Sequence, residues 1–465
     1  MKRFIFRALR VFSALDHWLG ERLTRAGWVA LGAAGAAGAA GLDTNQTVTY
    51  RAFTFLIALL ALSYLATLRF RVRLHASRVL PRYATAGERC VYRVVLANQG
   101  TRALKGATVI ERFRDPRPGF DEWRRAREPG EERRNWWDRT VGYFRWRWLI
   151  ERRLPRDVEA AELPPLAPGE REELRLAFTP RRRGRIELAG LTIGRTDPLG
   201  LARGLARLPL DARLVALPKR YRLPATALPG RRKFQPGGVS LAASVGDSEE
   251  FLALRDYRPG DPLQRVHWKS YARTGKPVVK EYQDEFFERH ALVLDTGTAR
   301  GEDAAFEDAV ALAASFVYTI DTHECLLDLL FVGPGIDEGR AAAGAAGAGR
   351  NGGGGGGVRA YTAGRGQMQS EHMLEVLAAV SPSEPAAFAE LARAVVARRE
   401  HLSSVILILL DWDEPRRALV SSLRAAGAEV RVLLVRPDGD APPDLPPGIL
   451  RLVPGKIAQG LAALR

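Results

Sequence analysis

The densest group of side chains that could do chemistry lies in the stretch LRDYRPGDPLQRVHWKSYARTGKPVVKEY, which runs from Leu254 to Tyr282. It mixes cationic, aromatic and acidic side chains with two turn signals, PGD and TGKP. The residues that could bind a ligand or a partner protein are Arg255, Tyr257, Asp261, Arg265, Trp268, Lys269 and Arg273.

Three roles are open for this stretch. It contains no Ser-His-Asp or Cys-His spacing and no paired carboxylates of the kind that hydrolysis requires, so we predict no catalytic residue. A structural and protein-interface role fits most of the residues, because arginines can fork onto Asp256 and Asp261 and because Trp268 and Tyr271 can supply buried area. Binding of an anion such as phosphate by the cations is the alternative, and catalysis is the third interpretation.

A second group consists of aspartates that end two apolar strands. HALVLD ends at Asp295, SVILILLD ends at Asp411, and Asp413 follows two residues later. Strands and helices alternate from residue 290 onward, which predicts a mainly parallel sheet with helices on both faces. Ligands in such folds bind at the carboxyl ends of the strands, so these aspartates are candidate metal ligands.

The run DTGTA at residues 295–299 resembles the Asp-x-Ser-x-Ser loop of the metal-ion-dependent adhesion site in von Willebrand factor A domains. That loop holds Mg²⁺ through oxygen ligands, but Gly297 and Ala299 occupy its two serine positions here. Ser383 is a candidate for the missing threonine, and Asp411 or Asp413 for the last carboxylate. We therefore expect a degraded site that holds no cofactor, with bound Mg²⁺ as the alternative. A structural role for Asp295 is also open, in which its carboxylate accepts backbone N–H bonds at the N-terminus of the next helix.

Two apolar segments near the N-terminus, Ala26–Leu42 and Ala52–Leu68, carry no charge and are just long enough to cross a bilayer. A short polar turn separates them, and arginines flank the pair on both sides. The positive-inside rule then places both flanks in the cytoplasm. We predict a two-helix membrane hairpin at residues 26–68, hence a multi-pass inner-membrane protein with most of the chain cytoplasmic. A buried helical hairpin of a soluble protein is the alternative.

Residues 1–25 place Ile5, Leu9, Phe12, Leu15 and Leu19 on one helical face and arginines largely on the other. This pattern is typical of a helix in the lipid headgroup layer, and equally of an amphipathic helix packed on the protein.

Residues 69–223 alternate with period two, which predicts a β-sandwich of short antiparallel strands. The Arg/Trp-rich segment 115–158 is interpreted as an insertion that either contacts the membrane surface or is a solvated helical segment.

Composition sets wider limits. The 465 residues are 46% hydrophobic and 26% charged, enough for two or three domains with real cores. A formal charge of +17 suits nucleic acid, anionic lipid or an acidic protein equally well. Cys90 and Cys325 lie far apart, so neither a disulfide framework nor a zinc site is indicated. The glycine-rich segment 339–357 predicts a disordered loop, and it lacks a phosphate-loop motif.

Two motifs together resemble a bacterial family known as domain of unknown function fifty-eight. RRRGRIELAGLTIGRTDPLGL, ending at Leu201, is similar to its upstream signature, with Leu199 in place of the usual Phe. Residues 246–285 are similar to its core motif, although His267 stands where many members have Asp and Gln283 lies among usual acidic positions. The resemblance covers about residues 70 to 440 and divides the rest into a core-motif segment, 224–289, and a von Willebrand factor A-like α/β domain, 290–465.

The resemblance implies a membrane-attached protein without a settled activity. Members of the family are thought to act with MoxR-type AAA+ ATPases and transglutaminase-like proteins. We therefore expect a non-enzymatic interaction or assembly protein that is anchored in the lipid bilayer and presents its α/β module to a MoxR-type ATPase. We expect no nucleic acid partner. The alternative is a membrane-bound anion- or phosphate-binding module, or an enzyme, that uses the basic core motif.

Overall fold

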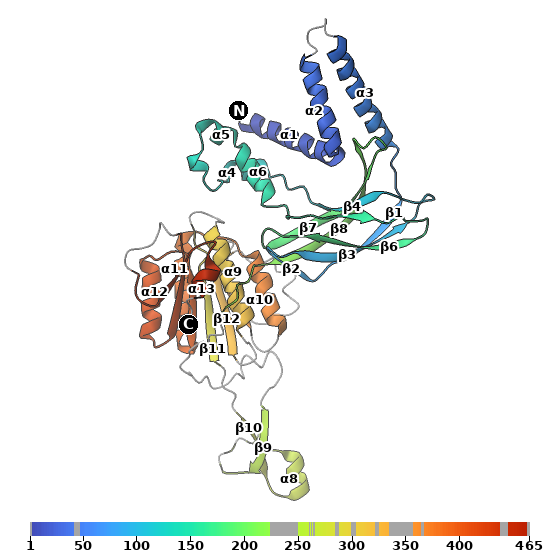
Figure 1. Cartoon of the computed structure of the whole chain (residues 1–465). Helices are drawn as coiled ribbons and strands as arrows, with labels where there is room; N and C mark the ends of the chain where they lie inside the picture. Colours follow the sequence, from blue (N-terminus) through green and yellow to red (C-terminus); the bar gives the residue numbers. More distant parts are fainter. Residues whose placement is uncertain are drawn as a thin grey trace. The chain divides into compact units, whose positions relative to one another are not determined.

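The computed structural model describes residues 2–40, 47–223, 250–259, 261, 263, 266–283, 288–298, 304–320, 325–333, 357–363, 367–437 and 445–462. The chain divides into two compact units, Met1–Lys219 and Arg220–Arg465 (Figure 1). Several predictions fall outside the described residues: the start of the core-motif segment at 224–249, Arg265, Ala299 and the glycine-rich loop up to residue 356.

Three helices open the first unit: α1 (Lys2–Arg22), α2 (Arg25–Ala40) and α3 (Thr47–Leu68). Among the described residues, one helix, at Val48–Leu68, is long and apolar enough to cross a membrane by length and composition. The first predicted span, Ala26–Leu42, coincides with α2 as far as Ala40, and its last two residues lie outside the described part of the chain. α2 packs along α3 (Figure 1), and a Cβ on Gly38 would lie 3.2 Å from the Phe53 ring, so the glycine permits this close approach.

Eight strands follow in two sheets. They are β1 (Leu74–Val79), β2 (Tyr83–Thr85), β3 (Cys90–Asn98), β4 (Ala107–Phe113), β5 (Ala160–Leu163), β6 (Arg171–Phe178), β7 (Gly184–Thr196) and β8 (Arg203–Leu217). One sheet has the order β1-β3-β6 and the other β2-β8-β7-β4-β5, with β2 and β8 parallel. Alternate residues of both sheets, such as Val94 and Leu96 of β3 and Leu191 and Ile193 of β7, share one core. The period-two pattern therefore buries one face of each sheet against the other.

A buried polar network crosses this core. Arg78 of β1 lies with its Nη2 2.6 Å from Glu111 Oε1 of β4, and the Tyr92 hydroxyl of β3 donates to Glu111 Oε2 at 2.6 Å. Burial raises the pKa of Glu111 to about 7, against the opposing effects of Tyr92 and Arg78. The network joins the two sheets at one register, because its members come from both.

The Arg/Trp-rich insertion is helical and lies between β4 and β5. It comprises α4 (Phe120–Arg125), a 3-10 turn at Glu131–Arg133, α5 (Trp136–Val141) and α6 (Tyr143–Glu151). Trp123 and Trp146 are buried and surround Phe6 of α1. The ring centroids of Phe6 and Trp146 are 5.4 Å apart in an edge-to-face arrangement. The insertion is therefore a platform on which α1 packs.

The second unit contains a two-stranded antiparallel hairpin and a short helix. The hairpin pairs β9 (Glu250–Asp256) with β10 (Val278–Gln283), and α8 (Trp268–Thr274) lies in the connection between them. α8 ends at Gly275, whose φ of 68° is the left-handed conformation that glycine adopts without strain. These elements place most of the described core motif on one small segment.

The rest of the second unit is a six-stranded sheet with helices on both faces (Figure 1). Its strands are β11 (Glu288–Leu294), β12 (Cys325–Gly333), β13 (Gly357–Ala363), β14 (Ser404–Leu409), β15 (Glu429–Val435) and β16 (Ile449–Leu452). Its helices are α9 (Ala304–Thr319), α10 (Gln367–Ala379), α11 (Phe388–Val396), α12 (Glu414–Ala425) and α13 (Ile457–Leu461).

The strand order is β13-β12-β11-β14-β15-β16, and all neighbours are parallel except β12 and β13. This confirms the predicted mainly parallel sheet. The sequence pattern did not predict β13, β16 or α13. 3-10 turns, at Pro385–Ala387 and Arg399–His401, flank α11 on both sides.

Candidate functional site

The carboxyl ends of β11 and β14 form the centre of the parallel sheet. After β11 the chain crosses to β12 on one side, whereas after β14 it crosses to β15 on the other. Such a switch point leaves a crevice at the strand ends where ligands of α/β folds bind. Asp295 follows β11 directly, and Asp411 and Asp413 lie in the loop after β14. The structure thus brings all three predicted metal ligands to one edge of the sheet.

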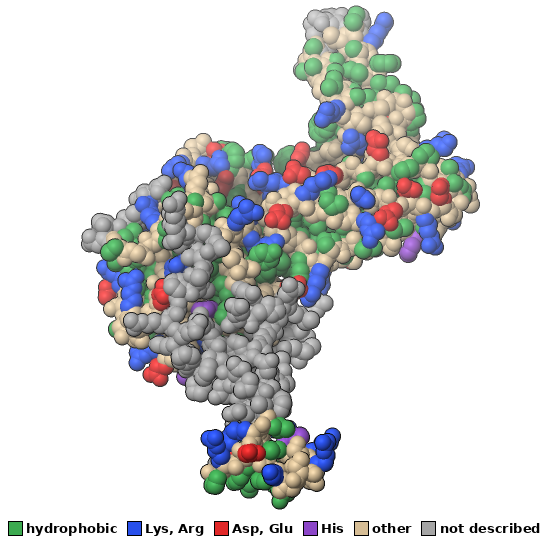
Figure 2. Space-filling model, turned by 60° about the horizontal axis from the view of Figure 1, so that its bottom comes forward, with side chains coloured by type: hydrophobic (Ala, Val, Ile, Leu, Met, Phe, Trp, Pro, Cys, Tyr) green, Lys and Arg blue, Asp and Glu red, His purple; other side chains and the backbone are tan. Residues whose placement is uncertain are grey.

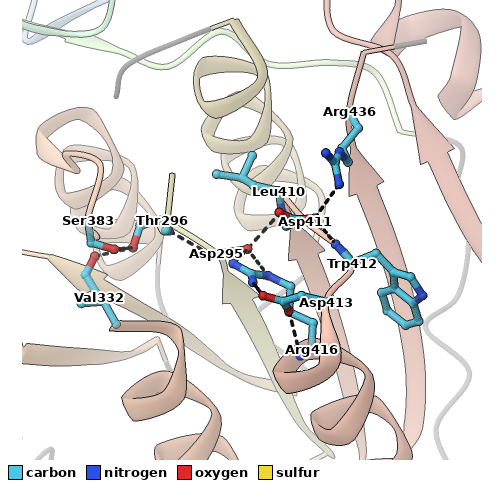
Figure 3. A network of polar contacts seen from close by, with 11 residues as sticks. Asp295, Thr296, Val332, Ser383, Leu410, Asp411, Trp412, Asp413, Arg416 and Arg436 are labelled. Carbon is cyan, nitrogen blue, oxygen red and sulfur yellow. Dashed lines mark hydrogen bonds and ion pairs between the residues drawn. The ribbon is translucent and has the colours of Figure 1, made fainter. Parts of the chain in front are cut away.

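At these strand ends lies a cation of the protein itself. Arg416, in the first turn of α12, donates from Nε to Asp295 Oδ2 at 2.7 Å, and its Nη2 also lies 2.7 Å from that oxygen. Figure 3 shows the guanidinium group between Asp295 and Asp413, where Nη1 donates to Asp413 Oδ2 at 2.6 Å. The guanidinium carbon also lies 4.3 Å from the centre of the Phe388 ring, a cation–π contact.

Asp295 is completely buried. Its Oδ1 accepts the backbone N–H of Gly297 at 2.9 Å, and its Oδ2 accepts that of Leu410 at 3.1 Å. Burial raises the pKa of the Asp295 carboxyl, while Arg416 and the two backbone donors oppose that rise. Asp295 therefore links the ends of β11 and β14 through Arg416 and the backbone.

The two remaining carboxylates have partners of their own. Asp413 caps α12, since its side chain accepts the backbone N–H of Arg416. Asp411 accepts the N–H of Trp412 at 2.7 Å and an N–H of Arg436, which follows β15. Asp411 and Arg436 are more exposed than the Asp295–Arg416 pair.

The residues that resemble an adhesion site bond to other groups of the protein. Thr296 donates to the carbonyl of Val332 at 2.6 Å and lies 3.0 Å from the Ser383 hydroxyl, so Ser383 does approach the loop as expected. Among the described residues, no group of three or more His, Cys, Asp or Glu side chains is arranged to hold a metal ion. The carboxylate oxygens that a metal would use are instead turned toward Arg416 and Arg436 (Figure 3).

Gly297 contributes to this arrangement by its small size. A Cβ at residue 297 would lie 3.2 Å from Asp295 Oδ1 and 3.5 Å from Arg416 Nη2. A serine at this position, as in the adhesion-site loop, would crowd the Asp295 carboxylate and the Pro385 backbone, which lies 3.2 Å from the same Cβ, whereas its contact with the guanidinium would be an ordinary one.

Sequence reasoning missed Arg416 and Arg436. A signal for Arg416 was present, because DEPR at residues 413–416 places an arginine three residues after a capping aspartate. Nothing local indicated Arg436, whose partner lies 25 residues away in the chain.

The core-motif segment is a second candidate site. Arg255 forks onto Asp261, with Nη1 to Oδ2 at 2.7 Å and Nη2 to Oδ1 at 2.6 Å. Asp261 also accepts the backbone N–H of Arg258 at 2.8 Å. Arg255 therefore holds the loop after β9, as the predicted fork onto a carboxylate implies. Tyr257 is tied to the other strand, since its N–H donates to the Pro277 carbonyl at 3.0 Å.

Two aromatic residues of this segment, Trp268 and Tyr271, are exposed. We predicted that Trp268 and Tyr271 supply buried area, and this is wrong: they are 59% and 43% exposed. They pack edge-to-face on each other, with ring centroids 6.0 Å apart. Among the side chains of the segment whose burial is described, Val266 and Val279 are the buried ones.

Cations surround the exposed aromatic pair. Lys269 and Arg273 lie on α8 and are exposed, as are Leu254 and Leu263. Figure 2 shows hydrophobic and basic side chains together over this segment. The structure thus brings together six of the seven predicted binding residues, and the seventh, Arg265, lies outside the described residues.

Comparisons with known proteins identify no function. No family model matches the chain. A protein of Bacillus subtilis (strain 168) described as uncharacterized protein YeaD is 25% identical over 182 residues, or 37% of this chain and 44% of that protein. The chain therefore spans less than half the length of this relative.

Two solved structures show only weak similarity. The CARDB domain of PF1109 from Pyrococcus furiosus is 10% identical, covers 31% of this chain and 93% of its own, and has a TM-score of 0.16. The ASH / PapD-like domain of human CEP192 is 11% identical, covers 31% and 87%, and has a TM-score of 0.16. Scores this low do not establish a shared fold.

The buried ion pair leads to a stability prediction. We expect Arg416→Met to lower the free energy of unfolding of the α/β sheet by about 3–5 kcal/mol, because it leaves the Asp295 carboxylate buried without its partner. The detergent-solubilised full chain is unfolded with urea, and hydrogen exchange of the β14 amides reports the unfolding of the sheet. The difference between the native chain and the variant measures this loss.

Arg436→Met is the matched control, because its partner Asp411 is half exposed; its expected effect is about 0–1 kcal/mol. Equal effects of the two substitutions would contradict a special role for the buried pair. Mg²⁺ is expected to leave the unfolding of the native chain unchanged. Stabilisation by Mg²⁺ that disappears in Asp295→Asn would show that the aspartates do form a metal site.

The Arg255 fork leads to a pH prediction. Hydrogen bonds from Arg255 and from the Arg258 backbone lower the pKa of Asp261 from 3.8 to about 2. A lowered pKa means that the fork stabilises the loop above pH 3.8 and that this contribution is lost as the pH falls toward 2.

In Arg255→Gln, the Asp261 pKa should rise back toward its ordinary value, as measured by carboxyl ¹³C chemical shifts. Arg258→Gln is the control, since it keeps the backbone donor, and it should shift the pKa less. An unchanged pKa in Arg255→Gln would rule out the fork.

Proposed function

We propose that this protein is a membrane-anchored, non-enzymatic interaction protein that presents its α/β unit and core-motif segment to a MoxR-type AAA+ ATPase. In this proposal α2 and α3 both cross the inner membrane, and the α/β unit is von Willebrand factor A-like. The resemblance of two sequence motifs to domain of unknown function fifty-eight supports the family and the partner.

The exposed surface of the core-motif segment is the observation on which the proposal depends. Trp268 and Tyr271 lie beside Lys269 and Arg273, on a helix whose neighbouring loop is held by the Arg255 fork. Exposed aromatic residues on a rigid support are the usual centre of a protein interface. The cations favour an acidic partner surface and speed its approach.

The pairing of the strand-end aspartates with arginines of the chain supports a non-enzymatic role. Arg416 and Arg436 already take up the charges of the three aspartates at the position where α/β folds bind ligands. Anion binding by the core motif is the alternative. Arg255 is engaged with Asp261, so this role would fall to Lys269 and Arg273.

The partner surface can be tested with a purified MoxR-type ATPase from the same organism and the full chain in nanodiscs. Trp268→Ala should weaken binding roughly thirtyfold, the effect of losing about 2 kcal/mol at an aromatic hot spot. Biolayer interferometry measures the affinity. The substitution leaves the fork of Arg255 and Asp261 intact, so the segment should remain folded.

Trp136→Ala is the control, because Trp136 is 73% exposed and lies outside this segment. Loss of affinity in both variants, or in neither, would refute the proposed surface. Inorganic phosphate that binds the native chain, and does not bind Lys269→Gln/Arg273→Gln, would favour the alternative function instead.

The proposed topology can be tested with reporters fused after Arg465. A cytoplasmic C-terminus should make green fluorescent protein fluoresce and leave alkaline phosphatase inactive, since the phosphatase needs the oxidising exterior to form its disulfides. The reverse pattern would place the α/β unit outside the cytoplasm and remove access to an ATPase.

A further inference from the structure

Helix α1 has two apolar sides: one is packed on the insertion, and the other is exposed except where Trp18 contacts Tyr64 of α3. Phe6 is buried among Phe120, Trp123 and Trp146 of the insertion, with Ile5 and Leu9 beside it. The predicted apolar face of α1 is therefore split, because Ile5 and Leu9 contact the insertion while Phe12 and Leu15 are exposed.

The other side of α1 is an exposed apolar stripe. Its members are Phe4, Val11, Leu15 and Trp18, which are between 40% and 76% exposed. The spacings of seven, four and three residues place them on one line along the helix. At 3.6 residues per turn, this line lies roughly opposite the side that carries Phe6 and Leu9. A helix that served only to pack on the insertion would carry polar residues here.

Cations border the stripe. Arg3, Arg7 and Arg10 follow one side of it and are exposed, and the described part of the first half of α1 contains no acidic residue. Long basic side chains beside an apolar stripe suit a surface that is apolar inside and negatively charged at its edge. An anionic phospholipid bilayer has this chemistry.

The stripe continues to the end of the apolar helix α3. Trp18 packs against Tyr64 of α3, with ring centroids 6.2 Å apart. The guanidinium of Arg22 lies 5.1 Å from the Trp18 ring and 5.7 Å from the Tyr64 ring. Tryptophan, tyrosine and arginine gather at the interface of a bilayer with water. This cluster marks the level at which α3 would leave the membrane, and the stripe of α1 begins there.

The connection between α1 and α2 fixes this geometry. Thr24 donates from its backbone N–H to the Leu201 carbonyl at 3.0 Å and from its hydroxyl to the Gly200 carbonyl at 2.6 Å. A Cβ on Gly27 would lie 2.1 Å from the Leu201 oxygen, so the start of α2 can approach the sandwich only with glycine there. α1 is thus held from both sides, by the insertion at Phe6 and by the sandwich at Thr24.

We propose that α1 is a docking surface for the anionic bilayer: it lies flat in the headgroup layer, with Phe4, Val11, Leu15 and Trp18 in the acyl boundary and its arginines on phospholipid phosphates. The Arg/Trp-rich insertion then supports α1 from the aqueous side through Trp123 and Trp146. This inference rests on the proposed membrane anchoring by α3 and adds a second, independently testable contact with the lipid.

Spin labels on the full chain in nanodiscs that contain phosphatidylglycerol test the proposal. Cys90 and Cys325 are buried, form no disulfide and are replaced by alanine. Single labels are placed at Val11→Cys on the stripe, at Arg10→Cys on the adjacent basic side, and at Phe55→Cys on the exposed side of α3. Collision rates with oxygen, which enters lipid, and with a polar nickel chelate, which stays in water, are then compared.

The ratio of oxygen to nickel collisions at Val11 should be severalfold higher than at Arg10 and should approach the ratio at Phe55. It should fall in nanodiscs of phosphatidylcholine alone, because the arginines then lose their anionic partners. Equal ratios at Val11 and Arg10 would place the stripe in water and overturn the proposal. A Val11 label shielded from both reagents would show that protein, such as a second copy of the chain, covers the stripe.

The Phe55 label separates this proposal from the anchoring itself. A lipid signal at Phe55 without one at Val11 would leave the anchor in place and refute only the surface contact of α1. The absence of a lipid signal at Phe55 would refute the anchor, whatever the result at Val11.

Discussion

The α/β unit depends on the buried ion pair of Asp295 and Arg416. The carboxylate ends the central strand β11, and the guanidinium comes from the helix after β14, so the pair joins two neighbouring strands where their connections diverge. A buried carboxylate without a partner would have to take up a proton or bind a metal. Arg416 supplies the compensating charge within the chain, and Asp413 and Phe388 hold that arginine in place.

The core-motif segment also contains an arginine–carboxylate pair, but the side chains around this pair are exposed. Arg255 and Asp261 hold a loop, and the aromatic side chains next to it remain exposed. At the strand ends, arginines neutralise the aspartates that could have bound a ligand. In the core-motif segment, Arg255 pairs with a loop carboxylate, and the exposed aromatic surface beside it remains available to a ligand or partner. This difference in exposure is the physical basis for placing the proposed interaction on the segment and not at the strand ends.

In the N-terminal unit, too, one side of an element is packed on the protein while the other side is exposed. Two tryptophans of the insertion form a core around Phe6, while the opposite apolar stripe of α1 is exposed apart from the contact of Trp18 with Tyr64. The sandwich holds the other end of α1 through the backbone at Leu201. Its own register is held by the buried network of Arg78, Tyr92 and Glu111, whose members come from both sheets. Rigid packing below α1 is what makes a flat contact with a bilayer geometrically feasible.

The sequence by itself determined the periodic elements. The apolar runs HALVLD and SVILILLD became β11 and β14, because strands of a parallel sheet are buried on both faces and therefore read as continuous apolar segments. The position of Asp295 at a strand end followed for the same reason. Only the tertiary structure decided which cation Asp295 meets, since Arg416 lies 121 residues further along the chain. The tertiary structure also decided that Trp268 is exposed and that α1 packs on the insertion through Phe6. The hydrophobicity of a side chain indicates that burial is favourable, but it does not indicate which surface will cover that side chain.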